Sequence, residues 1–218
     1  MENIEVVRSA EPRHEKTRRT AGMGGSAVEA VAGIGAVVLS ILALSGLLVV
    51  PFAAIALIAT GVALLFEAAA VASRETATHE GVGEKERPAV KSGVGADSIA
   101  GIGAITLGIL SLIGLYPMTL LPVGAIILGA GLLLSAAAPA AIEREEAHGS
   151  SIVRDTLAAA SGVHVLVGAG AVVLGILGVL GNSPVVMTLI ATLSIGAAQL
   201  LTGATISGRM TSLLRHGT

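Results

Sequence analysis

Five polar or ionisable residues lie within apolar stretches of this chain, where such residues are rare and costly. Glu29, Asp97 and His164 each precede by four residues the first glycine of a sixteen-residue phrase that occurs three times. Glu67 and Gln199 lie in the apolar runs that follow the first and third copies of the phrase. Inside a membrane, side chains of this kind can bind a cation or relay protons when they face a shared cavity.

The second pair is identified by aligning LIATGVALLFE, which ends at Glu67, with LIATLSIGAAQ, which ends at Gln199, while the middle copy has Ala137. Glu29 and Glu67 are both 16 to 17 residues from the loop between their two runs. At about 1.5 Å per residue this places both roughly 24 Å from that loop. We therefore predict a polar ring at the inner mouth of a helical bundle, made of Glu29, Glu67, Asp97, His164 and Gln199.

Helix capping is the competing interpretation of the same residues. Ser26 and Glu29 fit the S-x-x-E capping box, and Asp97 begins its apolar run, where the helix dipole favours a carboxylate. His164 and Gln199 can act as interfacial or interhelical hydrogen-bonding groups. Glu67 is different, because it lies near a helix C-terminus, where the dipole disfavours an anion. If Glu67 is buried without a cation, it is a candidate proton sensor.

The elements that must position these residues are membrane-spanning helices. Hydrophobic residues make up 53% of the chain, charged residues 13%, and the mean hydropathy is +0.87, which excludes an ordinary soluble domain. Apolar runs without Lys or Arg have the length of about 20 residues that crosses about 30 Å of hydrocarbon. They are continuous rather than alternating, which excludes barrel strands. The six predicted spans are 27–48, 51–73, 97–115, 120–142, 157–180 and 185–207.

A threefold repeat organises these spans into helical hairpins. The phrases are VAGIGAVVLSILALSG at 31–46, IAGIGAITLGILSLIG at 99–114 and LVGAGAVVLGILGVLG at 166–181. Each leads through an uncharged turn to a proline, a second apolar run and an arginine. The prolines are Pro51, Pro122 and Pro184, and the arginines are Arg74, Arg144 and Arg209. We expect an all-α integral membrane protein in which three parallel hairpin repeats form a pseudo-threefold bundle.

Small residues indicate where these helices touch. In lipid the hydrophobic effect does not bring helices together, so close backbone approach and dispersion must do so. Glycines recur at the same places in each phrase and are predicted to form helix-packing surfaces. They are Gly33, Gly35, Gly101, Gly103, Gly168 and Gly170.

Charge placement predicts the topology. All 13 Lys and Arg residues lie before the first span, in the two longer linkers or after the last span, whereas the three short loops carry no charge. By the positive-inside rule both termini face the cytoplasm of the inner (plasma) membrane. The expected segments are a charged N-terminal segment 1–26, hairpins 27–74, 96–144 and 157–209, linkers 75–95 and 145–156, and a tail 210–218. The N-terminal segment is expected to be disordered.

Several kinds of chemistry find no support in the sequence. There is no Cys, no HxxxH or HExxH spacing and no GxSxG, so we expect neither a metal, a cofactor nor an enzymatic reaction. A net charge of −2 and only three aromatic residues argue against nucleic-acid binding. The hydroxyl residues in the spans can satisfy their own helix backbone. They include Thr60, Thr106, Ser111, Thr188 and Thr192.

The layout resembles the HdeD-like acid-resistance family, also described as short-repeat membrane proteins. The resemblance covers roughly 27–207 and is carried by the periodicity, the turn prolines and the second runs PFAAIALIATGVALLFEAAA and PVGAIILGAGLLLSAAA, with Gly-x-x-Leu at Gly61–Leu64 and Gly131–Leu134. The scarcity of aromatic residues and the long charged leader depart from that pattern. The resemblance implies a prokaryotic inner-membrane protein with a role in acid or envelope stress, and it offers no motif residues to transfer.

Three functions are therefore considered. The first is a non-enzymatic multi-pass protein that supports stress tolerance. The second is a small channel or transporter that conducts protons or cations through the polar ring. The third is a membrane anchor subunit of a larger complex. Membrane lipids are the expected partners, with a homo-oligomer or a membrane-complex partner as further possibilities.

Overall fold

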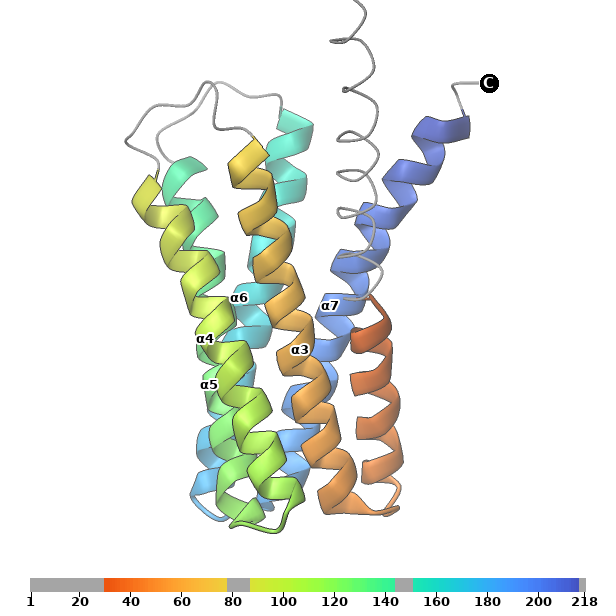
Figure 1. Cartoon of the computed structure of the whole chain (residues 1–218), viewed down its shortest axis with the longest axis vertical. Helices are drawn as coiled ribbons and strands as arrows, with labels where there is room; N and C mark the ends of the chain where they lie inside the picture. The colour runs from red at the N-terminus through yellow and green to blue at the C-terminus, as the bar shows by residue number, and fades with distance from the viewer. Residues whose placement is uncertain (1–29, 78–86, 144–150, 216–218) are drawn as a thin grey trace, which may run out of the picture.

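The computed structural model describes residues 30–77, 87–143 and 151–215, and every regular element in these ranges is an α-helix. A helix at Ala30–Leu44 is followed by α3 (Val49–Ala77), α4 (Arg87–Leu112), α5 (Pro117–Glu143), α6 (Ser151–Val179) and α7 (Pro184–Arg215). Figure 1 shows the helices side by side along one axis, with the three short turns together at one end. We call this the turn end. Glu29 lies outside the described residues.

Five of these helices are long and apolar enough to cross a membrane, and the Ala30–Leu44 helix is a shorter apolar helix. Their apolar windows, 18 to 21 residues long, match the thickness of the hydrocarbon layer. Many large apolar side chains on the outside are exposed, as expected where lipid rather than water surrounds the protein. The prediction of an all-helical fold is confirmed for the described residues, and the length and apolar composition of five helices are compatible with a multi-pass membrane protein. At the end opposite the turns, α4 and α6 begin at Arg87 and Ser151, within segments that were expected to be linkers.

The three turns share one backbone conformation. Gly46, Gly114 and Gly181 have φ angles of +93°, +88° and +93°, which glycine adopts without steric cost. In each case the glycine N–H donates to the carbonyl three residues back, and the next N–H donates to the carbonyl five residues back. This is the Schellman arrangement, which satisfies the last carbonyl groups of the helix. Two residues later the φ angle is positive again, at Leu48, Tyr116 and Ser183.

This shared geometry fixes which residues correspond in the second helices. The helices after the turns begin at Val49, Pro117 and Pro184, which are 68 and 67 residues apart, as the turn glycines are. Pro117 and Pro184 therefore occupy the first helical position, where a missing N–H costs nothing. Pro51, Pro122 and Pro184, the prolines that follow the three phrases in the sequence, do not occupy equivalent positions in the structure. Pro122 corresponds to Ala54 instead.

The second helices, α3, α5 and α7, contact one another and form the centre of the molecule. Positions 4, 8, 11 and 15 residues after the start of each helix are at most 1% exposed in all three, a spacing similar to that of coiled-coil seams. We call these four groups of three the core sets. They are Ala53, Leu121 and Thr188; Leu57, Ala125 and Thr192; Thr60, Leu128 and Ile195; and Leu64, Leu132 and Gln199.

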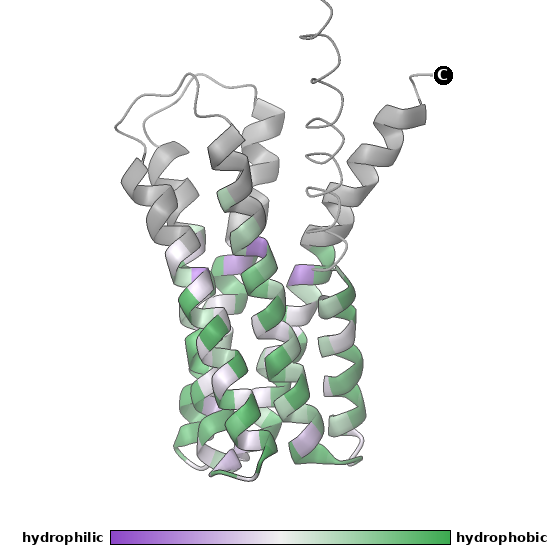
Figure 2. Cartoon of the chain, viewed as in Figure 1, coloured by the Kyte–Doolittle hydropathy of each residue, from purple (hydrophilic) through white to green (hydrophobic). Residues whose placement is uncertain are grey.

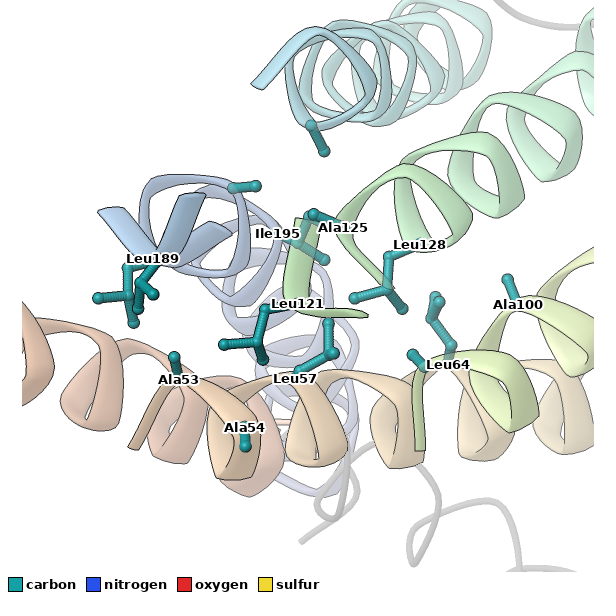
Figure 3. Packing of buried hydrophobic residues seen from close by; sticks show 14 of the residues in the cluster. Ala53, Ala54, Leu57, Leu64, Ala100, Leu121, Ala125, Leu128, Leu189 and Ile195 are labelled. Atoms are coloured by element: carbon teal, nitrogen blue, oxygen red, sulfur yellow. The ribbon is translucent and has the colours of Figure 1, made fainter. Parts of the chain in front are cut away.

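The core sets fill the space between the central helices with side chains of complementary size. Figure 3 shows Leu57, Leu121, Leu128 and Leu189 pointing into one cluster from the three helices. A Cβ atom added to Gly124 would lie 2.5 Å from Leu57 Cδ2, so a large residue on α3 is matched by the absence of a side chain on α5. Such complementarity gives the dispersion contacts that hold helices together in lipid.

Glycine pairs join each first helix to a second helix of another hairpin. A Cβ atom on Gly101 of α4 would lie 2.7 Å from the carbonyl oxygen of Gly61 of α3. A Cβ atom on Gly168 of α6 would lie 2.8 Å from the carbonyl oxygen of Gly129 of α5. The third pair joins the first and last hairpins, because a Cβ atom on Gly33 would lie 2.9 Å from the carbonyl oxygen of Gly196 of α7.

The other phrase glycines have different surroundings. A Cβ atom on Gly35 or Gly170 would meet nothing within 4 Å, so these positions lack the packing contact expected for them. A Cβ atom on Gly103 would lie 3.2 Å from Ile127 Cγ2 within the same hairpin. The difference follows from helix geometry, because residues two apart in a helix point to different faces.

One interhelical hydrogen bond distinguishes the contact between the first and last hairpins. The hydroxyl oxygens of Ser40 and Thr192 are 3.0 Å apart, and both residues are fully buried. The two residues that correspond to Ser40 are Gly108 and Gly175, which instead lie against α3 and α5 through Ile58 and Ile126. The Ala30–Leu44 helix therefore packs on α7 with a polar contact that the equivalent glycines do not make.

Replacing Gly101 by Ala should destabilise the protein by about 1–3 kcal/mol, because the new methyl group would collide with a backbone carbonyl that has no free direction to move. Gly35→Ala is the matched control, and it should be neutral or slightly stabilising because alanine favours helix. Thermal unfolding in one detergent measures both. Equal stability of the two variants would contradict the close α3–α4 contact.

Replacing Ser40 by Ala and Thr192 by Val, singly and together, should give a coupling energy of about 0.6 kcal/mol, the usual size for hydrogen bonds between membrane helices. The Thr192 hydroxyl also lies 3.1 Å from the carbonyl oxygens of Thr188 and Leu189, so Thr192→Val removes these contacts as well. Only a double-mutant cycle isolates the energy of the Ser40–Thr192 contact. The free energy of unfolding of the four proteins supplies the cycle. Strict additivity would contradict the hydrogen bond.

Candidate functional site

Three of the predicted ring residues meet inside the bundle, and they come from three helices. Glu67 of α3 and His164 of α6 approach each other, with Glu67 Oε1 4.0 Å from His164 Nε2. The Asp97 carboxyl group of α4 is close enough to Glu67 for the two charges to interact. We call Glu67, Asp97 and His164 the ionisable cluster. Sequence spacing places Asp97 and His164 at equivalent positions, and the structure brings Glu67 to both.

The cluster is largely removed from solvent. Asp97 is 6% exposed, and the side chains of Glu67 and His164 are 22% and 13% exposed. Two carboxylate oxygens, Glu67 Oε2 and Asp97 Oδ1, are buried without a hydrogen-bond partner among the described residues. Buried carboxylates are costly unless they gain a donor, a cation or a proton. The arrangement is therefore suited to binding a positively charged species.

Ser135 of α5 belongs to the same site and was missed by sequence analysis. It is a hydrogen-bonding neighbour of the Asp97 carboxyl group, and its hydroxyl also lies 3.2 Å from the carbonyl oxygen of Leu132. Counted from the turn, Ser135 corresponds to Glu67, whereas the sequence alignment put Ala137 there. The fixed distance from the turn glycine is the signal that would have identified Ser135.

Gln199 is placed differently from the other three. It is fully buried and corresponds to Leu64 and Leu132 in the core sets, one turn nearer the turn end than Glu67. Its Nε2 lies 3.5 Å from the carbonyl oxygen of Thr60, which is long for a hydrogen bond, and its Oε1 has no partner among the described residues. Gln199 is thus a polar group in a packing position, next to the ionisable cluster along the axis.

The interior between the cluster and the turn end is filled. The four core sets occupy it with side chains that are at most 1% exposed. The hydroxyl groups there bond to their own helix, as the sequence predicts: Thr60 to Ala56, Ser111 to Leu107 and Thr188 to Pro184. Figure 2 shows several strongly hydrophilic positions gathered at the upper limit of the coloured part of the bundle, above this largely apolar region. The cluster therefore lies on the side of this packed region that is away from the turn end.

Metal binding finds no support in the geometry. Within residues 30–77, 87–143 and 151–215, no three His, Asp or Glu side chains are arranged to hold a metal ion. The cluster contains two carboxyl groups and one imidazole, which can donate and accept protons.

Comparisons with known proteins do not assign the chain to a family. No family model, no curated protein and no solved structure matches it.

Replacing Gln199 by Leu should stabilise the protein by roughly 1 kcal/mol, because a buried carbonyl oxygen without a donor is removed and the corresponding residues are already leucine. The control is Gln199→Ala, which removes the same polar group but leaves a cavity and should destabilise. Thermal unfolding compares the two. A strong loss of stability in Gln199→Leu would mean that the amide makes an interaction that is essential to the core.

Proposed function

We propose that the chain is a non-enzymatic, multi-pass protein of the inner membrane, with both termini in the cytoplasm, that contributes to tolerance of acid or envelope stress. The observation that carries this proposal is the ionisable cluster, which lies beyond the last core set, with packed side chains between it and the turn end. Protons can reach such a cluster from one side without crossing the membrane. The HdeD-like layout of the sequence favours the same role.

We further propose that the three hairpins close into a pseudo-threefold bundle. The three glycine pairs support it, since Gly61–Gly101, Gly129–Gly168 and Gly196–Gly33 occupy corresponding positions. The mutual contacts of α3, α5 and α7 support it as well. In this arrangement the second helices form an inner triangle and the first helices fill the outer grooves.

The orientation rests on charge. The three turns carry no Lys or Arg, whereas all such residues lie toward the other end or in the termini. Under the positive-inside rule the turn end is then external and the cluster lies near the cytoplasmic surface. Membrane lipids are the direct partners of the exposed apolar side chains, and we propose no nucleic-acid partner.

A small proton or cation channel or transporter is the second candidate. The two buried carboxylate oxygens without partners favour it, because intramembrane ionisable groups often line ion pathways. The packed core sets argue against a permanently open path. A membrane anchor subunit or a homo-oligomer is a third candidate, which native mass spectrometry of the protein purified in mild detergent would reveal.

Cells of the source organism that carry only the Glu67→Gln variant should survive acid exposure no better than cells from which the gene is deleted, because the cluster loses an ionisable group. Wild-type complementation should restore survival. The control is Glu143→Gln, which removes a carboxylate outside the described apolar spans and should complement fully. Normal acid and envelope-stress survival of the deletion strain would refute the stress role.

Vesicles that contain the wild-type protein should show no proton or potassium flux above that of empty vesicles, because four buried core sets block the interior. A pH-sensitive dye inside the vesicles measures the proton flux. Steady flux that disappears in Glu67→Gln would favour the channel over the stress protein without conduction.

A further inference from the structure

The ionisable cluster has too many acidic groups for its one base. The elements packed around it contribute Ser135 from α5 and Gln199 from α7, and neither of these titrates. The parts of the helices whose side chains the structure describes contain no Lys or Arg. With neutral imidazole and two carboxylates the cluster would carry a charge of −2, and two protons would make it neutral.

Two buried carboxylate oxygens that lack a hydrogen-bond donor indicate where a proton can bind. Asp97 is more than nine-tenths buried, and its Oδ1 faces α5, where a Cβ atom on Gly131 would lie 3.8 Å away. Neither this oxygen nor Glu67 Oε2 has a hydrogen-bond partner among the described residues. A protonated carboxyl group removes the charge and supplies an O–H donor, whereas an ionised one offers only acceptors.

The packed core sets separate the cluster from the turn end. The partial exposure of Glu67 and His164 lies beyond the last core set, and toward the turn end every core set is buried. A proton can therefore enter and leave at the end opposite the turns. That this end is cytoplasmic rests on the proposed function.

We propose that Glu67, Asp97 and His164 form a proton-binding site that exchanges with one side of the membrane only. The bound species is the proton. When the cluster loses protons, like charges on α3 and α4 repel in a region of low dielectric, so proton loss weakens the packing of these two helices. The site thus links the pH on one side to the packing of the bundle.

Difference infrared spectroscopy of the full-length protein in nanodiscs tests this site. Spectra recorded at acid and alkaline pH should differ in the carbonyl band of protonated carboxyl groups. Glu67→Gln and Asp97→Asn should each remove part of that difference, and the double variant should remove both parts. Asp155→Asn, outside the apolar span of α6, should leave the cluster's part intact. Both substitutions within the cluster preserve side-chain shape, and size-exclusion chromatography verifies that each variant folds.

Three results would overturn the proposal. The first is an unchanged difference spectrum in both cluster variants. The second is a band that responds to sodium or potassium, but not to choline, at constant pH, which would make the ligand a monovalent cation. The third is proton flux across vesicles, which would contradict one-sided exchange. The stress role fails separately, if Glu67→Gln cells survive acid normally although the infrared signal is lost.

Discussion

The whole structure depends on the close approach of helix backbones at paired glycines. Helices in lipid are not surrounded by water, so the hydrophobic effect does not bring them together. They associate through dispersion and polar contacts, which require short separations. At the pairs Gly61–Gly101, Gly129–Gly168 and Gly196–Gly33 an added Cβ atom would lie between 2.6 and 3.1 Å from a facing carbonyl oxygen. Without these contacts the first helix of each hairpin could not pack closely against the three central helices.

The central helices determine what the interior can contain. Their core sets combine large and small side chains, so the axis is packed from the turns to the level of Gln199. Beyond that level the pattern changes from mainly apolar to polar, with Glu67 on α3 and Ser135 on α5. The ionisable cluster therefore lies directly beyond the last core set, where the packed apolar interior ends. In the proposed function, this separation favours the binding of protons over their conduction.

The sequence was sufficient to predict the helical class, the three uncharged turns and the use of hydroxyl groups by their own helices. It also placed Asp97 and His164 at one level, because their distance to the turn glycine is equal. It misplaced Gln199 relative to Glu67, since the repeated letters LIAT at 57–60 and 189–192 are three residues out of register with the turns. A shift of about one helical turn keeps apolar residues on a similar face, so hydropathy cannot detect it. The backbone of the turn determines which residues of the second helices correspond, and only this correspondence identifies Ser135 as the equivalent of Glu67.

The bundle closes through the contact between the first and last hairpins, and disulfide cross-linking in membranes measures this contact directly. The chain has no native Cys, so cysteines can be introduced in pairs at Ala36 and Gly196, Gly61 and Ala104, and Gly129 and Ala171. The Cβ separations at these pairs would be 3.0 to 3.1 Å, slightly shorter than the about 3.5–4.5 Å of a disulfide. Closure predicts that all three pairs form intramolecular disulfides with similar yields, as mass spectrometry of the linked peptides would reveal. Cross-linking of the second and third pairs without the first would contradict it.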